Sequence, residues 1–543
     1  MQDNGNLAVL VVDPNPGMRT SLQNMLNLAG IGKIEYAVNA NTAVRQLQRR
    51  AYDIILCEYD LAGSGGEGQD GQQLLEDLRH HRLLPPATIF IMLTSEGVHD
   101  KVVSAAELTP TDYVLKPFTA DLLGARIRRA LERRAALLPA WQLAAQGKAR
   151  DAIAACRDGA AAQPRFATDF ARIRAELHTG LNEHAAAGAV YREVLAERPL
   201  GWAALGLART LFALDQAEDA RAILEPLLQA NPRLMAGYDL LARCLESQGE
   251  HEAAKKVLAD AVGISPHVVR RLRKLGEVAL AAGDLDAAEK SYRQVVSKAR
   301  YSEFRDPEDH VNLVKTLVKR DDLPGASAVV RDLERTMRGN PALEACRAYA
   351  ASLVHDRAGN AGAALADLQA AVTAVRASGA LSPGLRMELA QACLDHRMDE
   401  QASSVMLTVM HDAASGVSVD QALHVFVKAG RTDLVEGMDQ QLRAQAQILL
   451  GVADEKRNMG DVRGAVQTLL EALHIAPHNL QVMVATAGGI LRQVNELGWD
   501  HPLGDTAQRL LDSIQAQDAR HPRLAALQDQ YQAARRKYGI AAM

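Results

Sequence analysis

The sequence predicts two fold classes in one chain: a doubly wound α/β domain with a parallel sheet, followed by an all-α superhelix. Two observations lead to this prediction. Residues 6–136 alternate short apolar runs with amphipathic segments, a pattern typical of βαβ units. After Pro139 the strand-like runs end, and alanine-rich helical segments recur with regularly spaced prolines up to the C-terminus. We therefore place a change of architecture at Pro139.

The N-terminal segment contains apolar runs that suit strands buried on both faces. The run at 7–12 reads LAVLVV, and the run at 89–93 reads IFIML. Alternation with amphipathic segments indicates right-handed crossovers and a parallel sheet, with functional residues at the carboxyl ends of its strands. The predicted strands are 7–12, 54–57, 89–93 and 113–115, and the predicted helices are 18–29, 72–81 and 119–134.

The C-terminal segment repeats with a period of about 34 residues. Prolines stand at 164, 199, 232 and 266, and an alanine precedes each by twelve positions, at 152, 187, 220 and 254. This period is the signature of helix–turn–helix solenoids of the tetratricopeptide type. Small residues let paired helices touch, and a proline stops the second helix. Further clear units run from Leu275 to Tyr292 and from Ala446 to Pro477, whereas the period is weaker between 300 and 440.

These patterns divide the chain into four predicted parts. They are an α/β domain at 1–136, regular repeats at 140–300, degenerate helical repeats at 301–440, and a repeat with C-terminal capping helices at 441–543.

Composition narrows the class of protein. The net charge is −5 and five cysteines are scattered without a C-x-x-C pair, which argues against nucleic-acid binding and favours a reduced, cytoplasmic protein. No apolar stretch approaches the roughly 18 residues of a membrane-spanning helix. The start MQDNG lacks the basic residues of a signal peptide. We expect no contact with membrane or nucleic acid.

Four stretches resemble the receiver domain of bacterial response regulators: VLVVDPN (9–15), ILCEYDL (55–61), MLTSE (92–96) and DYVLKPF (112–118). This resemblance implies a five-stranded sheet in flavodoxin-like order. The later residues resemble tetratricopeptide repeats. Together the two parts look like the receiver–tetratricopeptide proteins of proteobacteria, most of all at 57–79.

The resemblance also implies roles for single residues. In the family an aspartate ending the third strand accepts a phosphoryl group, and two acids after the first strand hold Mg²⁺. Here Glu58 takes the acceptor position, and Asp13 matches one acid while Pro14 follows it. The residues that match the family's phosphoryl-binding and reporter positions are Thr94, Lys116, Pro117 and Tyr113.

Two departures from the family pattern weaken phosphorylation. Pro14 has no side-chain oxygen for Mg²⁺, which prefers oxygen ligands, so Asp13 is at best a weak metal ligand and we expect no cofactor. Glu58 carries its carboxylate about 1.5 Å farther from the backbone than aspartate does, one C–C bond more. That carboxylate can instead reach toward Lys116 and Thr94. Three readings stay open: a pseudo-receiver with a permanent ion pair, a drifted residue without a switching role, and residual phosphorylation at Glu58 or Asp60.

Charged residues in the helical part suggest a surface for a protein partner. Arg270, Arg273 and Glu277 follow at spacings of three and four and so share a helix face, and Asn312 and Lys315 extend the series into the next unit. On the concave side of a solenoid they would hold an acidic peptide; the alternative is ordinary surface charge. The basic stretch ARIRRALERR (125–134) allows docking to a histidine kinase or another receiver, or a homodimer.

The glycine pattern G-x-G-x-x-G at 66–71 follows the third strand rather than the first, so we interpret it as a loop and not as a nucleotide site. No catalytic motif is present, and no enzyme activity is expected. The sequence predicts a non-enzymatic signal-transduction adaptor of a two-component-type pathway. The alternative is a conventional response regulator switched by phosphorylation of Asp60 or Glu58.

Overall fold

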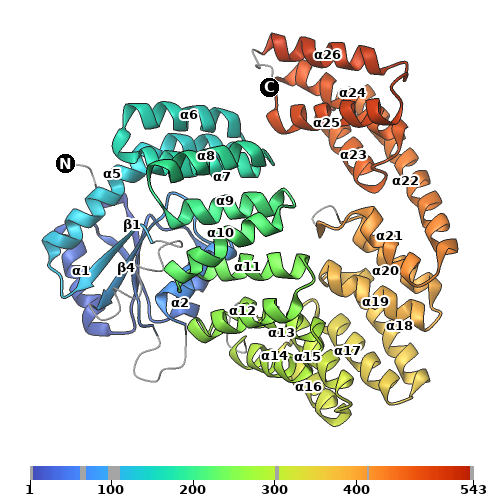
Figure 1. The fold of residues 1–543 in the computed structure, drawn as a ribbon, viewed down its shortest axis with the longest axis horizontal. Helices are drawn as coiled ribbons and strands as arrows, with labels where there is room; N and C mark the ends of the chain where they lie inside the picture. Colours follow the sequence, from blue (N-terminus) through green and yellow to red (C-terminus); the bar gives the residue numbers. More distant parts are fainter. Residues whose placement is uncertain (1–3, 62–68, 96–109, 300–304, 413–414, 539–543) are drawn as a thin grey trace. The chain divides into compact units, whose positions relative to one another are not determined.

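The computed structural model describes residues 4–61, 69–95, 110–299, 305–412 and 415–538 (Figure 1). The chain divides into two compact units, residues 1–309 and 310–543. The predicted α/β domain and the first helical repeats therefore share the first unit.

The first unit begins with a five-stranded parallel sheet in the order β2-β1-β3-β4-β5, which confirms the predicted fold class. Leu and Ile side chains of the central strands are buried on both faces, as the continuous apolar runs predict. The strands are β1 (Ala8–Val12), β2 (Lys33–Ala37), β3 (Ile54–Glu58), β4 (Ile89–Ser95) and β5 (Asp112–Lys116).

Helices cover both faces of this sheet. On one face, α1 (Pro16–Leu28) and α5 (Ala120–Ala145) pack on side chains such as Val9 and Ile91. On the other, α2 (Ala40–Arg49) and α3 (Gly71–His80) pack on side chains such as Leu10 and Phe90. The sequence analysis assigned no element to β2 or α2. The edge strand β2 is only partly buried, so its sequence KIEYA lacks the apolar run that marks the central strands.

The junction at Pro139 differs from the prediction. Helix α5 does not end near residue 134 but continues through Pro139 to Ala145. Pro139 is exposed, whereas its neighbours Leu137 and Ala140 are buried in an apolar cluster with Phe170 of the next hairpin. Burial of these neighbours compensates for the backbone hydrogen bond that proline cannot donate. One helix thus belongs to both the α/β domain and the first helical repeat.

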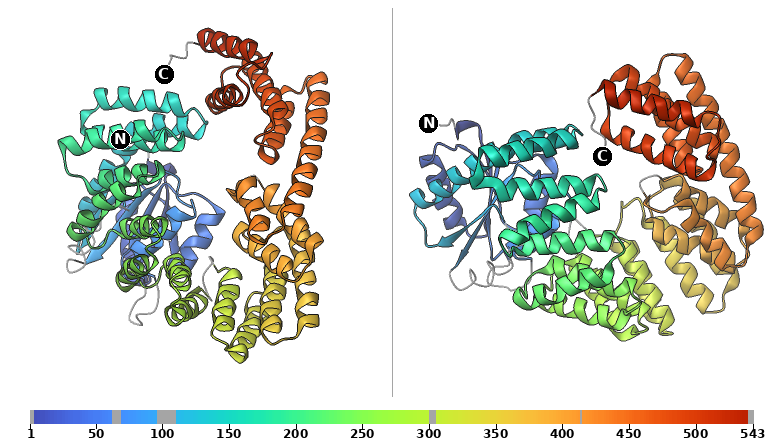
Figure 2. Two further views of the ribbon diagram at one scale, coloured as in Figure 1. Left: turned by 45° about the vertical axis from the view of Figure 1, so that its right-hand side comes forward. Right: turned by 45° about the horizontal axis from the view of Figure 1, so that its top comes forward.

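Antiparallel helical hairpins follow α5 and stack in a row beside the sheet (Figure 2). The four alanines of the predicted repeat, Ala152, Ala187, Ala220 and Ala254, are all fully buried, as expected for positions where paired helices touch. The helices are α6 (Ala149–Ala162), α7 (Ala167–Gly180), α8 (His184–Glu197), α9 (Gly201–Ala213), α10 (Ala217–Ala230), α11 (Met235–Ser247), α12 (His251–Ile264), α13 (Val269–Ala281) and α14 (Leu285–Ala299), with the short 3₁₀ helices η1 (Asn4–Asn6) and η3 (Pro164–Phe166).

The second unit is helical throughout its described residues, including the stretch where the sequence period weakens. The predicted unit at 446–477 is formed by α22 and α23, and Gly460 takes a left-handed conformation, with φ of 83°, at the turn between them. The first helix, α15, begins two residues before this unit. The helices are α15 (Glu308–Lys319), α16 (Leu323–Thr336), α17 (Leu343–Arg357), α18 (Ala361–Ser378), α19 (Pro383–Asp395), α20 (Asp399–Met410), α21 (Val419–Lys428), α22 (Thr432–Asn458), α23 (Val462–Ile475), α24 (Leu480–Leu497), α25 (His501–Gln517) and α26 (Leu524–Lys537).

All five cysteines are free and buried. Among the helices that the structure describes, none is both long and apolar enough to cross a membrane.

Close helix contact at Gly276 generates a test of the hairpin packing. A methyl group at this position would lie 2.8 Å from the Tyr292 ring, so we expect Gly276→Ala to destabilise the fold by about 1–3 kcal/mol through overpacking. Gly263 lies in α12 with open space around it, and Gly263→Ala is expected to be neutral or stabilising by up to about 1 kcal/mol. Urea unfolding followed by circular dichroism measures the free energy of unfolding of both variants. Equal changes would contradict the close contact between Gly276 and Tyr292.

Candidate functional site

Four polar side chains meet at the carboxyl edge of the sheet. Asp13 follows β1, Glu58 ends β3, Thr94 lies near the end of β4, and Lys116 ends β5. Parallel strands in register bring these positions to one edge: Glu58 lies opposite Leu93, and Lys116 opposite Ser95. The sequence analysis expected this grouping. We call these four residues the carboxylate pocket.

An ion pair between Lys116 and Glu58 forms the centre of the carboxylate pocket. The Lys116 ammonium donates a hydrogen bond to Oε2 of Glu58. The other oxygen, Oε1, accepts a hydrogen bond of 3.1 Å from the backbone N–H of Asp60. The Glu58 side chain is only 13% exposed. Both of its carboxylate oxygens are therefore engaged by groups of the same chain.

Asp13 is the most buried acid of the carboxylate pocket, with 1% of its side chain exposed. Its Oδ1 accepts a hydrogen bond of 2.7 Å from the backbone N–H of Asn15. Its Oδ2 has no hydrogen-bond partner among the described residues and lies 3.7 Å from the Lys116 nitrogen. The Lys116 charge thus faces two carboxylates.

The same geometry tests whether a magnesium ion would fit. The oxygen of Asp13 that has no hydrogen-bond partner is a suitable ligand, but both Glu58 oxygens are engaged and Pro14 supplies no side-chain oxygen. In the part of the chain that the structure describes, no group of three His, Cys, Asp or Glu residues is placed to hold a metal ion. The donor set fits Mg²⁺ poorly, because the Lys116 ammonium lies where it neutralises the same carboxylates.

The remaining predicted residues lie around the ion pair. Thr94 is fully buried, and its hydroxyl donates to the carbonyl oxygen of Ser95 at 3.4 Å rather than to Glu58. The Lys116–Pro117 peptide bond is cis. Tyr113 is half-buried beside Tyr59, and burial raises the pKa of its phenol. The predicted reach of Glu58 toward Lys116 is confirmed, whereas its two hydrogen bonds go to Lys116 and Asp60 and not to Thr94.

The start of α3 packs directly behind the carboxylate pocket. The N–H of Gly71 donates to the carbonyl oxygen of Tyr59 at 2.7 Å. A methyl group at Gly71 would lie 2.5 Å from the carbonyl oxygen of Glu58, so only glycine allows this close approach. Asp70 caps the helix through a reciprocal pair of hydrogen bonds with Gln73. Of the predicted glycine pattern, residues 66–68 lie outside the described residues.

The predicted partner-binding residues are already engaged within the chain. Arg270 lies 3.4 Å from Asp239 and 3.5 Å from Glu76, and Arg273 forms two hydrogen bonds of 2.5 and 2.8 Å to Asp309. Glu277 lies 3.3 Å from Lys274. In the second unit, Lys315 pairs with Glu388 at 2.6 Å and lies 3.4 Å from Asn312. An acidic peptide would have to compete with these acids.

Sequence reasoning missed the residue of this region with the most buried charge, Arg271. Its side chain is fully buried and contacts Asp239 and Glu76, which lie 32 and 195 positions away in the sequence. The only signal in the sequence was the basic stretch HVVRRLRKLG itself. Helical periodicity did not identify the arginine that faces inward, because the domain covering that face is distant in the sequence.

Comparisons with known proteins agree with this architecture. Residues 9–128 match the response regulator receiver domain, and residues 236–268 match the tetratricopeptide repeat. The chain is 27% identical over 130 residues to the chemotaxis protein CheY-3 of Vibrio cholerae, covering 24% of this chain and 95% of that protein. It is 28% identical over 127 residues to the chemotaxis protein CheY of Pseudomonas aeruginosa, covering 23% and 98%.

Among solved structures, a tetratricopeptide repeat protein from Parabacteroides merdae is similar, with 12% identity, a TM-score of 0.36, and coverage of 47% of this chain and 96% of that one. The two family matches identify a response regulator receiver domain at residues 9–128 and a tetratricopeptide repeat at residues 236–268 within the helical part.

Proposed function

We propose that this chain is a non-enzymatic signal-transduction adaptor whose receiver domain works without phosphorylation and whose tetratricopeptide repeats bind a protein partner. The observation that carries the proposal is the contact of the Lys116 ammonium with the Glu58 carboxylate. In this proposal Glu58 replaces the phosphoacceptor aspartate, and its carboxylate supplies a negative charge beside Lys116 that a phosphoryl group would otherwise bring.

The chemistry of phosphoryl transfer supports this proposal. Transfer to a carboxylate depends on in-line positioning of the acceptor oxygen and on metal charge that neutralises the phosphoryl oxygens. Both Glu58 oxygens are held by hydrogen bonds, and the ligands for Mg²⁺ are incomplete beside Pro14. An acceptor held in this way reacts slowly even with an activated donor.

The helical repeats supply the binding part of the adaptor. Solenoids offer extended inner surfaces that suit peptides and helices. We expect a protein partner there, with a histidine kinase, another receiver or a second copy as partners of the receiver domain. The buried, free cysteines are compatible with a reducing compartment, and we place the protein in the cytoplasm as part of this proposal.

Exposure to a small phosphodonor tests the receiver. The full chain incubated with acetyl phosphate and Mg²⁺ is expected to gain no phosphoryl adduct in intact mass spectrometry, because the acceptor position and the metal ligands are both altered. A variant that combines Glu58→Asp with Pro14→Asp is expected to gain one, because it restores the shorter acid and a second carboxylate ligand.

An adduct on the unaltered chain would contradict the proposal and support a conventional response regulator. The variants Glu58→Gln and Asp60→Asn then assign it, since removal of the true acceptor abolishes the adduct.

Removal of the Lys116 charge tests the ion pair. In Lys116→Met the carboxylates of Asp13 and Glu58 lose their shared cation, and we expect local stability at the ends of β1 and β3 to fall by about 1–3 kcal/mol. Native-state hydrogen exchange of these strands measures the loss. Addition of Glu58→Gln is expected to recover part of it, because one of the two uncompensated charges is removed.

Lys33 provides the matched control, because it is exposed on β2 and contacts only Asn6 among the hydrogen bonds described for its ammonium. Lys33→Met is expected to change the local stability measured by hydrogen exchange by less than about 0.5 kcal/mol. Equal losses for the two variants would show that the Glu58–Lys116 pair does not hold the carboxylate pocket together.

A further inference from the structure

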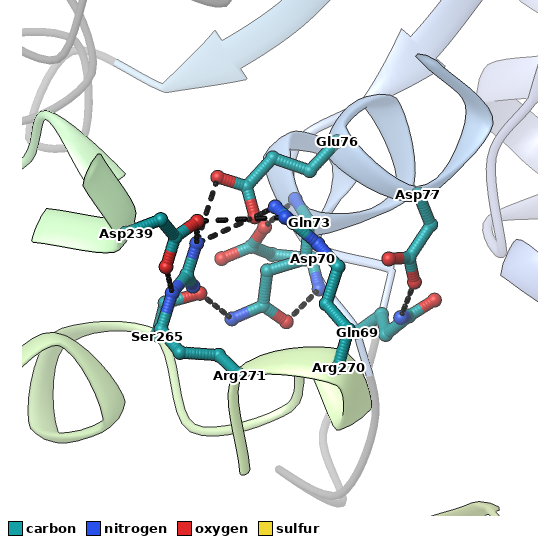
Figure 3. A network of polar contacts seen from close by, with 9 residues as sticks. All are labelled: Gln69, Asp70, Gln73, Glu76, Asp77, Asp239, Ser265, Arg270 and Arg271. Carbon is teal, nitrogen blue, oxygen red and sulfur yellow. Dashed lines mark hydrogen bonds and ion pairs between the residues drawn. The ribbon is translucent and has the colours of Figure 1, made fainter. Parts of the chain in front are cut away.

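Helix α3 of the receiver domain is buried on two sides. Its leucines, Leu74, Leu75 and Leu78, pack into the core against the sheet. Its polar side chains Gln73, Glu76 and Asp77 are buried as well, with 4–6% exposed. A surface helix ordinarily turns such residues to water. Here Gln73 and Glu76 face helices of the repeats, whereas Asp77 accepts a hydrogen bond of 2.5 Å from Gln69 (Figure 3).

The surface that covers α3 contains a cluster of charged and polar side chains. It consists of Asp239 on α11, Ser265 at the end of α12, and Arg270 and Arg271 on α13. Arg271 donates from Nε and Nη2 to the two oxygens of Asp239 at 2.8 and 3.0 Å. This bidentate pair lies wholly within the repeats, so Asp239 orients the guanidinium independently of α3. We call these four residues the arginine notch.

The receiver fills the arginine notch with longer contacts. The Glu76 carboxylate lies 3.5 Å from Nη2 of Arg271 and 3.5 Å from Nη2 of Arg270. Three residues earlier on α3, the Gln73 amide donates to the Ser265 hydroxyl at 3.3 Å. Figure 3 shows both side chains directed from α3 toward the repeats. The occupant is thus a helix that presents an amide and a carboxylate at i and i+3.

Two features mark α3 as a replaceable occupant. Nη1 of Arg271 and Nε of Arg270 are buried donors without a hydrogen-bond partner among the described residues. Burial also raises the pKa of the Glu76 carboxyl group, against the opposing charges of Arg271 and Arg270. A buried donor without a partner costs free energy. A carboxylate that approached these guanidinium groups more closely would therefore bind them better than Glu76 does.

We propose that the face of α11, α12 and α13 that carries the arginine notch is a binding site for an acidic amphipathic helix of a protein partner, and that α3 occupies this site in cis. The partner helix carries a carboxylate and, one turn before it, a hydrogen-bonding side chain for Ser265. It displaces α3 from the arginine notch and leaves Asp239 in place. This inference does not depend on whether residue 58 is phosphorylated.

Displacement of α3 would affect the carboxylate pocket through Tyr59. Tyr59, next to Glu58, accepts the Gly71 N–H through its carbonyl oxygen. Its phenol interacts with Asp70 at the start of α3 and with Arg233, which lies between α10 and α11. The residue beside Glu58 therefore contacts both α3 and the repeats, so partner binding and the state of the carboxylate pocket would influence each other.

A charge reversal on α3 tests the site in the full chain. In Glu76→Lys the new ammonium faces Arg270 and Arg271, so α3 is expected to leave the arginine notch, with at least tenfold faster hydrogen exchange of its amides. A fluorescent peptide with the sequence of residues 69–81 is expected to bind this variant at least tenfold more tightly than the unaltered chain. Adding Arg271→Met is expected to abolish that binding.

Matched controls separate the notch from general effects of charge. Asp121→Lys reverses an exposed acid on the same domain and is expected to change neither exchange of α3 nor peptide binding. A peptide that itself carries Glu76→Lys is expected not to bind. Protection of the β1, β3 and β4 amides reports whether the sheet stays folded; where it does not, Glu76→Gln replaces Glu76→Lys, with the same order of affinities expected.

Two results would overturn the inference. One is unchanged exchange of α3 in a folded Glu76 variant, which would show that the arginine notch does not hold the helix. The other is peptide binding that is equal with and without Arg271, which would show that the notch does not recognise the carboxylate.

Discussion

A guanidinium group buried without carboxylate partners would cost several kcal/mol, and this constraint organises the first unit. The Arg271 side chain is fully buried, and its two carboxylate neighbours come from α11 and from α3. Asp239 forms a bidentate pair with Nε and Nη2 of Arg271, while Glu76 of the receiver domain makes longer contacts to the same Nη2. The α/β domain and the repeats therefore meet at a buried charged side chain as well as at the apolar cluster of α5.

In the carboxylate pocket, too, buried charges are paired within the chain. Lys116 forms an ion pair with Glu58 and lies near the second acid, Asp13. Gly71 keeps the start of α3 in contact with the backbone of Glu58 and Tyr59. The first turn of α3 thus lies between the carboxylate pocket and the arginine notch.

Local patterns in the sequence were sufficient for four of the five strands, for most helices around the sheet and for the repeat. Apolar runs identified β1, β3 and β4, and the spacing of Ala152, Ala187, Ala220 and Ala254 identified positions that are fully buried. The four residues of the carboxylate pocket were predicted from the resemblance to receiver domains, and the ends of the parallel strands bring them to one edge. The edge strand β2 was not predicted, because it is only partly buried and lacks an apolar run. The path of α5 through Pro139 was not predicted either, because burial of Leu137 and Ala140 outweighs the helix-breaking tendency of proline. The arginine notch depends on contacts across 195 positions, which no local pattern encodes.

The unbroken helix α5 has a consequence for how such proteins can change in length. An α-helix turns by about 100° for each residue, so one insertion between its receiver half and its repeat half would swing the solenoid around the helix axis. Arg271 would then no longer lie opposite Glu76. Insertions and deletions in this stretch should be tolerated only when they leave the rotation of the repeats about the helix axis nearly unchanged. The length of α5 therefore determines whether Arg271 and Glu76 meet.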